Sequence, residues 1–306
     1  MAFPSPDRLA TIARQATVTF ADELGPRSRA IWDAMLARRA EVSAGAPDYL
    51  HSFAQPIVLV PLWAAQAVTA SGGAADEAMV ETAAAAGAIG YYAVRLQDDL
   101  VDEEMGDPGA IAVLSSAVLA SAQSRLGSIG LSPGFWRWHS GVMLRYAEAM
   151  QFEAEVRANP GGYDEAAFDQ VMERSRPLVV PGVAVLDATG AWPLRSDFEQ
   201  MVIAATSALQ LINDLGHAAK DISVGNRTWV HTLLGVRDES PLTRGRLIGG
   251  MDRVFDQIKC RLKDVIDLGR DLGVPEAAGW AEKTERAAAD RFERLLVWLL
   301  ETPPRR

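Results

Sequence analysis

The sequence predicts an all-α protein, a single large helical bundle in which residues 1–306 form one domain. Apolar residues recur at spacings of three and four along almost the whole chain, which is typical of helices with one buried face. No stretch alternates apolar and polar residues between hairpin turns, so no strands are expected. The breaks are short enough to connect helices rather than domains.

Each predicted helix is a periodic apolar segment between start and stop signals. Two of them are the most informative. The helix over 76–105 ends at Gly106-Asp107-Pro108-Gly109, and the helix over 196–223 begins with the capping box Ser196-Asp197-Phe198-Glu199 and ends before Gly225. In chain order the predicted helices span residues 6–22, 27–43, 54–70, 76–105, 110–127, 133–157, 164–175, 177–190, 196–223, 241–272 and 276–301.

The amino-acid composition is that of a globular protein with a negative net charge, which argues against some classes of ligand. The chain is 49% hydrophobic and 23% charged, which is enough apolar material for a large core. Its 40 acidic and 30 basic side chains give a net charge of −10, which opposes binding to nucleic acid. A small anionic ligand is still compatible with this charge, because a divalent metal can bridge carboxylates and phosphate oxygens.

The sequence gives no sign of secretion or of a membrane span. The single cysteine, Cys260, cannot form an internal disulfide. Residues 1–9 carry Pro4, Pro6 and Asp7 where a signal peptide needs an apolar stretch, and the apolar segment 57–68 is too short to cross a bilayer. We therefore expect a cytoplasmic protein.

The first acidic cluster lies at the end of the predicted helix 76–105. Asp98 and Asp102 are one helical turn apart with Asp99 beside them, so they form an oxygen-rich group. Glu103 and Glu104 follow directly. Because helix C-termini favour cations, five acids at this end are unfavourable unless a positive group lies among them.

A second polar stripe lies late in the helix 196–223. Asn213, His217 and Asp221 fall at i, i+4 and i+8, with Gln210 and Asp214 beside them. Oxygen ligands of this kind suit Mg²⁺, which shares its shell between carboxylates and phosphates. Either cluster alone could be an ordinary solvated helix end. Two such clusters, each ending a long apolar helix, favour metal binding at the mouth of an apolar cavity.

The two clusters carry a resemblance to a known family. Gln97–Glu103 (QDDLVDE) is similar to the first aspartate-rich motif of trans-isoprenyl diphosphate synthases and class I terpene synthases. Leu209–His217 (LQLINDLGH) resembles their second motif, and Lys220-Asp221 with Gly225–Thr228 resembles its tail. The resemblance implies the isoprenoid synthase fold, a single helical bundle around a deep apolar pocket. It also implies a small-molecule prenyl diphosphate as substrate, about three Mg²⁺ ions when diphosphate is bound, and a homodimer as the assembly of some relatives.

The departures from this family bear on the subclass. The cationic motif of the chain-elongating members is replaced by His51–Pro56 (HSFAQP), and the arginines that follow their first motif are missing. An unpaired diphosphate is costly to bury, so isopentenyl diphosphate should not bind as a second substrate. Asn213, His217 and Asp221 are similar in register to the metal motif of terpene cyclases, which predicts a terpene synthase.

The resemblance also implies roles for individual residues. Asp98 and Asp99 act through Mg²⁺, and Tyr91, two turns earlier, faces the allylic cation. Small Ala93 leaves the pocket deep enough for a C15 or C20 substrate. Arg174 and Arg176 precede a proline-bounded segment that resembles the broken, diphosphate-sensing helix of terpene synthases. The predicted metal ligands are Asp98, Asp99, Asp102, Asn213, His217 and Asp221, and the predicted substrate-binding residues are Arg174, Arg176, Gln210, Asp214, Lys220 and Arg227.

Alternative functions remain open from the sequence. A prenyltransferase needs the same ionisation machinery, whether it is an isoprenyl diphosphate synthase or transfers to a non-diphosphate acceptor. A catalytically silent regulatory subunit would explain His217 and the missing basic residues, but the Asp98, Asp99 and Asp102 set argues against it. Arg291-Phe292 lies where cyclases often have an Arg-Tyr pair, with Phe in place of Tyr.

Overall fold

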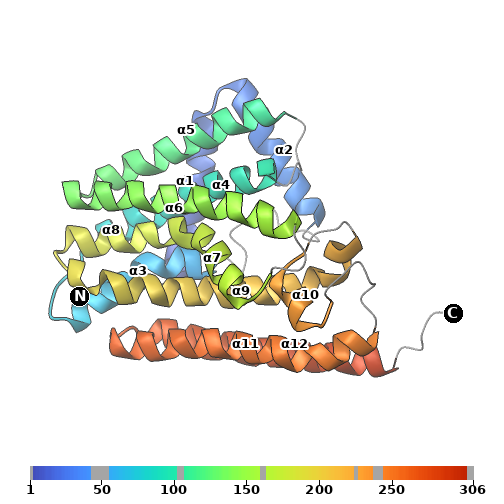
Figure 1. The fold of residues 1–306 in the computed structure, drawn as a ribbon. Helices are drawn as coiled ribbons and strands as arrows, with labels where there is room; N and C mark the ends of the chain where they lie inside the picture. Colours follow the sequence, from blue (N-terminus) through green and yellow to red (C-terminus); the bar gives the residue numbers. More distant parts are fainter. Residues whose placement is uncertain are drawn as a thin grey trace. The chain divides into compact units, whose positions relative to one another are not determined.

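The computed structural model describes residues 3–42, 55–101, 107–158, 163–223, 227–236 and 244–301, and every regular element in these ranges is a helix (Figure 1). The α-helices are α1 (Pro6–Glu23), α2 (Pro26–Val42), α3 (Gln55–Ala70), α4 (Glu77–Val101), α5 (Pro108–Gly127), α6 (Pro133–Ala158), α7 (Glu165–Met172), α8 (Val180–Ala188), α9 (Arg195–Ser223), α10 (Trp229–Leu233), α11 (Arg244–Asp271) and α12 (Pro275–Glu301). The same described ranges also contain the 3₁₀ helices η2 (Glu173–Val179) and η3 (Trp192–Leu194).

The all-α prediction is confirmed, with two local differences. The predicted helices 164–175 and 177–190 are joined through η2, so the chain continues as a 3₁₀ helix where a break was expected. Helix α10 was not predicted, because five residues are too short to show a periodic pattern. It is nucleated by a capping box in which His231 replaces the usual Glu or Gln.

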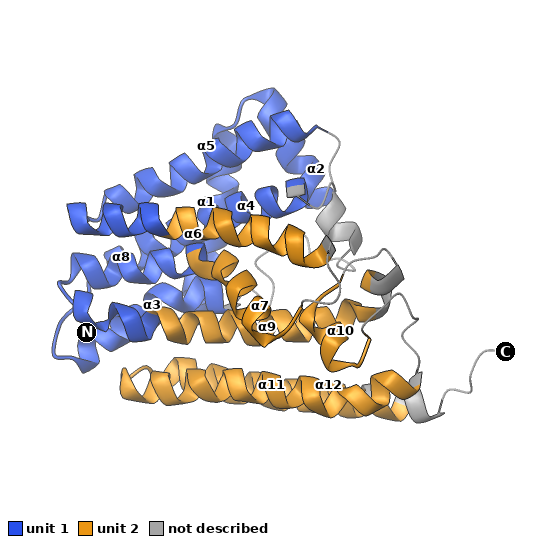
Figure 2. Cartoon of the chain, in the orientation of Figure 1, with its two compact units in different colours: residues 1–141, 177–198 blue, residues 142–176, 199–306 orange. Residues whose placement is uncertain are grey.

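The chain forms two compact units, which Figure 2 colours separately. Unit 1 comprises residues 1–141 and 177–198, and unit 2 comprises residues 142–176 and 199–306. The boundaries at 141/142 and 198/199 fall inside α6 and α9, whereas domain boundaries usually fall in exposed linkers. That the whole chain is one domain stays a prediction.

In unit 1, α4 packs against α1, α3, α5 and α8. Its sequence permits this because small alanines alternate with larger apolar residues around the helix, so several faces can be buried at close range. Ile89, Tyr92 and Leu96 are almost completely buried, and Tyr92 stacks on Trp32 of α2 with ring centroids 4.8 Å apart. The Ser115 hydroxyl of α5 donates a 3.1 Å hydrogen bond to the carbonyl of Ala93. Helix α4 is therefore held firmly at the level of Ala93, five residues before Asp98.

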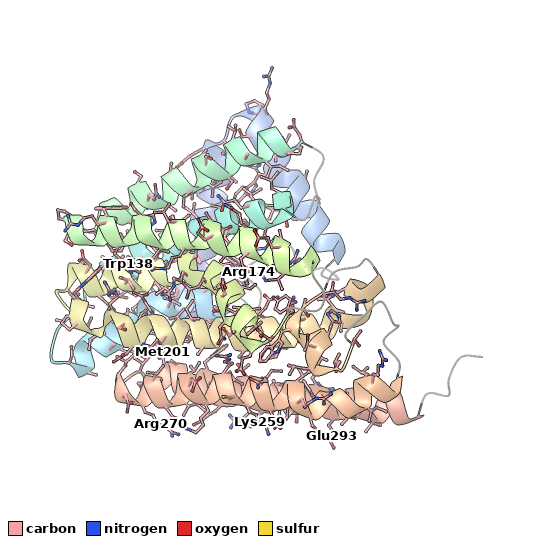
Figure 3. All side chains as sticks on the ribbon, in the orientation of Figure 1. Trp138, Arg174, Met201, Lys259, Arg270 and Glu293 are labelled. Atoms are coloured by element: carbon pink, nitrogen blue, oxygen red, sulfur yellow. The ribbon has the colours of Figure 1, made fainter. Side chains whose placement is uncertain are left out.

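In unit 2, α11 and α12 form an antiparallel pair joined by a short turn at Gly273, which has φ of 69°. Phe255 and Phe292 meet between them at 4.9 Å. The pair is amphipathic: Val254, Ile258, Leu262 and other apolar residues of α11 are buried. Figure 3 labels three charged side chains of the pair, of which Arg270 and Glu293 are exposed and Lys259 is partly exposed.

One helix of the described residues, α5, is long and apolar enough to cross a membrane by length and composition. A single helix of this kind is weak support for a span, because a core helix can pass the same test. Helix α5 packs on α4 and buries Ile111, Leu114 and Val118. This buried face is typical of a helix that covers a protein core.

Glycine at position 182 is required by the packing of α8. A Cβ atom there would lie 2.5 and 2.7 Å from ring atoms of Phe198 and 2.7 Å from a methyl carbon of Val60. We predict that Gly182→Ala destabilises the protein by about 1–3 kcal/mol, because the buried ring has no room to move away. Urea denaturation measures this loss.

The matched control is Gly141→Ala in α6, where a Cβ atom would meet nothing within 4 Å. Replacing a helical glycine by alanine at such a position should leave stability unchanged or raise it by up to about 1 kcal/mol. Equal effects of the two substitutions would contradict the packing argument.

Candidate functional site

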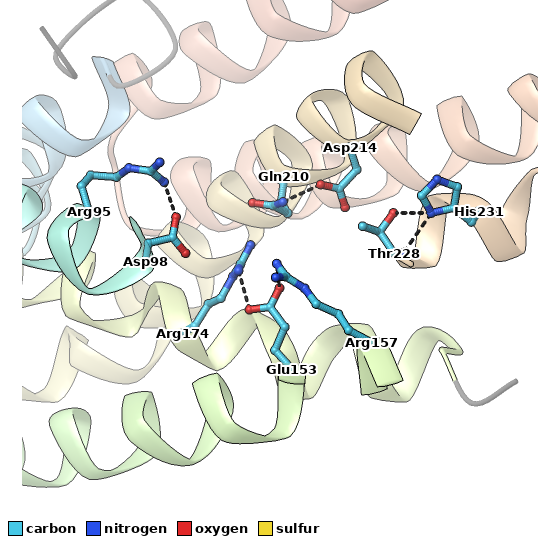
Figure 4. Close-up of polar contacts among 9 residues, drawn as sticks. All are labelled: Arg95, Asp98, Glu153, Arg157, Arg174, Gln210, Asp214, Thr228 and His231. Carbon is cyan, nitrogen blue, oxygen red and sulfur yellow. Dashed lines mark hydrogen bonds and ion pairs between the residues drawn. The ribbon is translucent and has the colours of Figure 1, made fainter. Parts of the chain in front are cut away.

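Helix α4 positions the first acidic cluster in unit 1 and provides a cation beside it. The Arg95 side chain donates a hydrogen bond of 2.6 Å from Nη1 to Asp98 Oδ2, and its Nη2 lies 3.7 Å from Asp99 Oδ1 (Figure 4 draws the first of these contacts). Asp99 is buried, with 7% of its side chain exposed, whereas 21% of the Asp98 side chain is exposed. The more accessible carboxylate is therefore the one that Arg95 contacts most closely.

Sequence analysis did not identify Arg95. The signal was present, because a residue three positions before Asp98 and four before Asp99 faces both on a helix. Arg95 supplies the positive group that the acids at this helix end require. Asp102, Glu103 and Glu104 lie outside the described residues.

Tyr91 lies on α4, as predicted, and is partly buried. Its ring packs edge-on to that of Tyr92, with centroids 6.5 Å apart. Ala93 is 1% exposed. These placements agree with an apolar environment next to the first acidic cluster, and the roles assigned to the two residues stay predictions.

Helix α9 positions the second polar stripe, and burial divides its residues into two groups. Asp214 is buried and Gln210 partly buried, and the Gln210 amide donates a 2.5 Å hydrogen bond to Asp214 Oδ1 (Figure 4). Asn213 and His217 are exposed. The side of the stripe that faces inward is therefore the Gln210–Asp214 side.

Burial raises the pKa of Asp214 to about 7, because the charged carboxylate loses water. Arg174 and the Gln210 hydrogen bond oppose this rise, and Asp221 and Glu153 add to it. A cation bound nearby would stabilise the charged form of this buried carboxylate. Asp221 is partly buried, and Lys220 lies on α9 with its side chain outside the described part.

Arg174 and Arg176 both lie on η2, but they have different partners. Arg174 Nη1 donates a 2.5 Å hydrogen bond to Glu153 Oε2 of α6. Arg176 pairs with Glu173 through Nε and donates a 2.5 Å hydrogen bond from Nη1 to Glu199. These carboxylates raise the pKa of Arg176, Glu173 most strongly. Both of the predicted substrate-binding arginines on η2 are thus paired with carboxylates.

The segment that follows α9 is fixed by His231 (Figure 4). Its Nδ1 accepts a 2.9 Å hydrogen bond from the Thr228 backbone N–H. Its Nε2 lies 2.9 Å from the Ala218 carbonyl, which can only accept, so Nε2 carries the proton. Arg227, at the start of this segment, is 7% exposed. A neutral histidine therefore joins the last turns of α9 to α10.

Helix α12 brings Arg291 to the second polar stripe. A Cβ atom on Gly216 would lie 3.2 Å from Arg291 Nη2, so the glycine lets this guanidinium lie close to the backbone of α9. Phe292 is buried against Phe255 and holds α12 in place. Of the two residues Arg291 and Phe292, it is therefore Arg291 that lies beside the second polar stripe.

The side chains that could bind a metal ion through oxygen atoms lie on two helices, α4 and α9. Among the residues that the structure describes, no three His, Cys, Asp or Glu side chains lie close enough together to hold a metal ion by themselves. Asp98 with Asp99 on α4, and Asp214 with Asp221 on α9, are carboxylate pairs. Such incomplete sets fit Mg²⁺, which commonly completes its shell with water and substrate phosphate.

We predict that acid weakens the fold in part through His231. Burial lowers its pKa, Arg227 lowers it further, and Asp221 and the hydrogen bonds to Ala218 and Thr228 oppose this. The unfolded chain takes up the proton near pH 6.5 and the folded chain only below that, so stability is lost as the pH falls through this window. Urea denaturation of His231→Gln should show a smaller loss between about pH 8 and pH 5 than the wild type.

Part of the loss should remain in this variant, because burial also lowers the pKa of His139. At about pH 8 the variant should be less stable than the wild type by about 1 kcal/mol, the usual size of a weakened hydrogen bond. The idea is wrong if His231→Gln loses as much stability on acidification as the wild type.

Comparison with known proteins identifies the fold. No family model and no curated protein matches the sequence. The crystal structure of a geranyltranstransferase from Methanosarcina mazei matches with a TM-score of 0.55 over 96% of this chain and 98% of that chain, at 13% identity. Heptaprenyl diphosphate synthase from Staphylococcus aureus matches with a TM-score of 0.43 over 88% and 95%, at 12% identity. On the first of these similarities, the chain has the all-α fold of isoprenyl diphosphate synthases.

Proposed function

We propose that this protein is a Mg²⁺-dependent terpene synthase that ionises an allylic prenyl diphosphate of C15 or C20 length, forms a cyclic or eliminated terpene and releases pyrophosphate. The observation that carries the proposal is the pair of acidic motifs on α4 and α9 in a chain with the fold of isoprenyl diphosphate synthases. The described residues of each motif lie in the last turns of a long helix. This agrees with the family resemblance of both motifs.

The oxygen ligands of both helices supply the proposed metal sites. When bound, Mg²⁺ would neutralise the diphosphate and make it a better leaving group. Asp98 and Asp99 are held by Arg95, so both carboxylates are already oriented by a cation. The proposed ligands are Asp98, Asp99, Asp102, Asn213, His217 and Asp221.

The basic and amide side chains bind the diphosphate in this proposal. As the carbon–oxygen bond breaks, both electrons leave with the diphosphate, and guanidinium groups stabilise the growing negative charge. Arg174 lies on the η2 segment between α7 and α8, which agrees with the resemblance to a diphosphate-sensing broken helix. The proposed substrate-binding residues are Arg174, Arg176, Gln210, Asp214, Lys220 and Arg227.

The allylic cation left behind must be kept from water and close to aromatic faces. Tyr91 is the proposed aromatic residue, on the same helix as the first motif and partly buried. Buried Ala93 adds no bulk at its position. The cation is then quenched by loss of a proton after cyclisation or directly by elimination.

The proposed terpene synthase differs from a chain-elongating synthase in lacking the cationic site for isopentenyl diphosphate as a second substrate. The segment 51–54 that replaces the cationic motif lies outside the described residues, so the argument here rests on the sequence. Prenyl transfer to a non-diphosphate acceptor uses the same ionisation residues and is the second candidate. The two differ in whether products form without an added acceptor.

We predict that Asp98→Asn lowers pyrophosphate release by at least about 100-fold, because one ligand charge is lost where the leaving group is neutralised. Release is measured from geranyl, farnesyl and geranylgeranyl diphosphate with Mg²⁺, with and without isopentenyl diphosphate, and products are identified by gas chromatography. The control is Glu77→Gln, a partly exposed carboxylate on the same helix that pairs with Arg8 at 2.8 Å. It should keep wild-type activity.

Each outcome of this assay has a meaning. Release without isopentenyl diphosphate, together with a hydrocarbon or terpene alcohol, supports the terpene synthase. Turnover only in the presence of isopentenyl diphosphate contradicts the loss of the second site. Silence of the wild type with every substrate and acceptor contradicts the proposed function and favours a regulatory subunit.

A further inference from the structure

Glu153 is a buried carboxylate that neither the sequence motifs nor the proposed reaction uses. It lies on α6, with 8% of its side chain exposed. Its Oε1 accepts a 2.7 Å hydrogen bond from Arg157 Nη2, and its Oε2 accepts a 2.5 Å hydrogen bond from Arg174 Nη1. One carboxylate thus bridges two guanidinium groups, each on a different oxygen (Figure 4).

The two arginines reach Glu153 from different parts of the chain. Arg157 is four residues later on α6, so this contact is local. Arg174 is 21 residues later, on η2, and its contact fixes a short 3₁₀ segment to a long helix. A 3₁₀ helix has poorer hydrogen-bond geometry than an α-helix, so its side chains depend more on outside contacts for their orientation.

The bridge lies within the electrostatic range of the second acidic motif. Arg174 lowers the pKa of Asp214, whereas Glu153 raises it. The buried Tyr163 hydroxyl lies in range of the same groups, and its pKa is raised first by burial and then by Glu153 and Asp214. Glu153, Arg157 and Arg174 therefore belong to the polar cluster around Asp214, which also contains Gln210.

We propose that Glu153 is a positioning residue that orients Arg174 and Arg157 to bind the diphosphate group of the substrate. The proposal rests on the proposed function, and it adds Glu153 and Arg157 to that site. A charge-assisted bond to one nitrogen fixes the plane of a guanidinium and so the directions of its other N–H groups. The cluster of two arginines and one carboxylate keeps a net positive charge, which suits an anion.

A purely electrostatic role for Glu153 predicts the opposite result from a positioning role. Removing a negative charge beside two arginines should tighten anion binding by Coulomb attraction. If Glu153 instead fixes their geometry, its loss should weaken binding although the net charge becomes more positive. The sign of the change in affinity therefore separates the two.

The test is titration calorimetry of the wild type and Glu153→Gln with inorganic pyrophosphate, in the presence and absence of Mg²⁺. We expect Glu153→Gln to bind pyrophosphate at least about 10-fold more weakly in both conditions, because the amide oxygen can replace only one of the two carboxylate bonds. Circular dichroism and thermal unfolding confirm that the variant is folded. Tighter or unchanged binding by the folded variant overturns the proposal.

The matched control is Asp169→Asn, which changes the net charge by the same amount. Asp169 is exposed on α7 and pairs with Arg261 at 2.6 Å. It should bind pyrophosphate as the wild type does, and an equal loss in this variant overturns the proposal. Glu153→Asp, which keeps the charge on a shorter side chain, replaces the first variant if Glu153→Gln does not fold, and should also bind more weakly.

A double-mutant cycle excludes a merely structural effect. In an Arg157→Gln, Arg174→Gln background, the further change Glu153→Gln should cause no additional loss of pyrophosphate affinity, because Glu153 acts through these two groups. An additional loss of equal size overturns the positioning role. Failure of the proposed function is seen separately: the wild type would then bind pyrophosphate but release none from any prenyl diphosphate.

Discussion

Carboxylates that are buried between helices need cations beside them, and this requirement organises both candidate binding regions of the chain. On α4, Arg95 balances Asp98 and Asp99 from the same helix. In unit 2, Arg157 and Arg174 balance Glu153. The first arrangement is local and survives as long as α4 is helical, whereas the second depends on η2 staying next to α6. The two regions therefore differ in how far they depend on tertiary packing.

Much of the fold could be predicted because long helices with one buried face leave a periodic trace in the sequence. The predicted ends of α1, α6, α9 and α12 agree with the structure to within a residue, because proline, serine and glycine mark them. Short elements leave no such trace. Helix α10 depends on His231 reaching Ala218 at the end of α9, and this contact is between residues 13 positions apart.

The candidate site could be predicted only in part. Spacing on a helix shows which side chains share a face, so Gln210 and Asp214, four residues apart, could be placed together from the sequence alone. Spacing does not show which face is buried. Asp214 is inside while Asn213 and His217 are exposed, although all belong to one motif. The partnership of Glu153 with Arg174 joins two helices, and no local pattern encodes it.

The seven residues of η2 have a mechanical consequence. A 3₁₀ helix rises about 2.0 Å per residue and an α-helix about 1.5 Å, so winding this segment into α geometry would shorten it by roughly 3.5 Å. A change between the two helix types therefore alters the length of the segment while its residues stay helical. Side chains on such a segment can thus shift by about the diameter of an atom while the segment keeps helical structure.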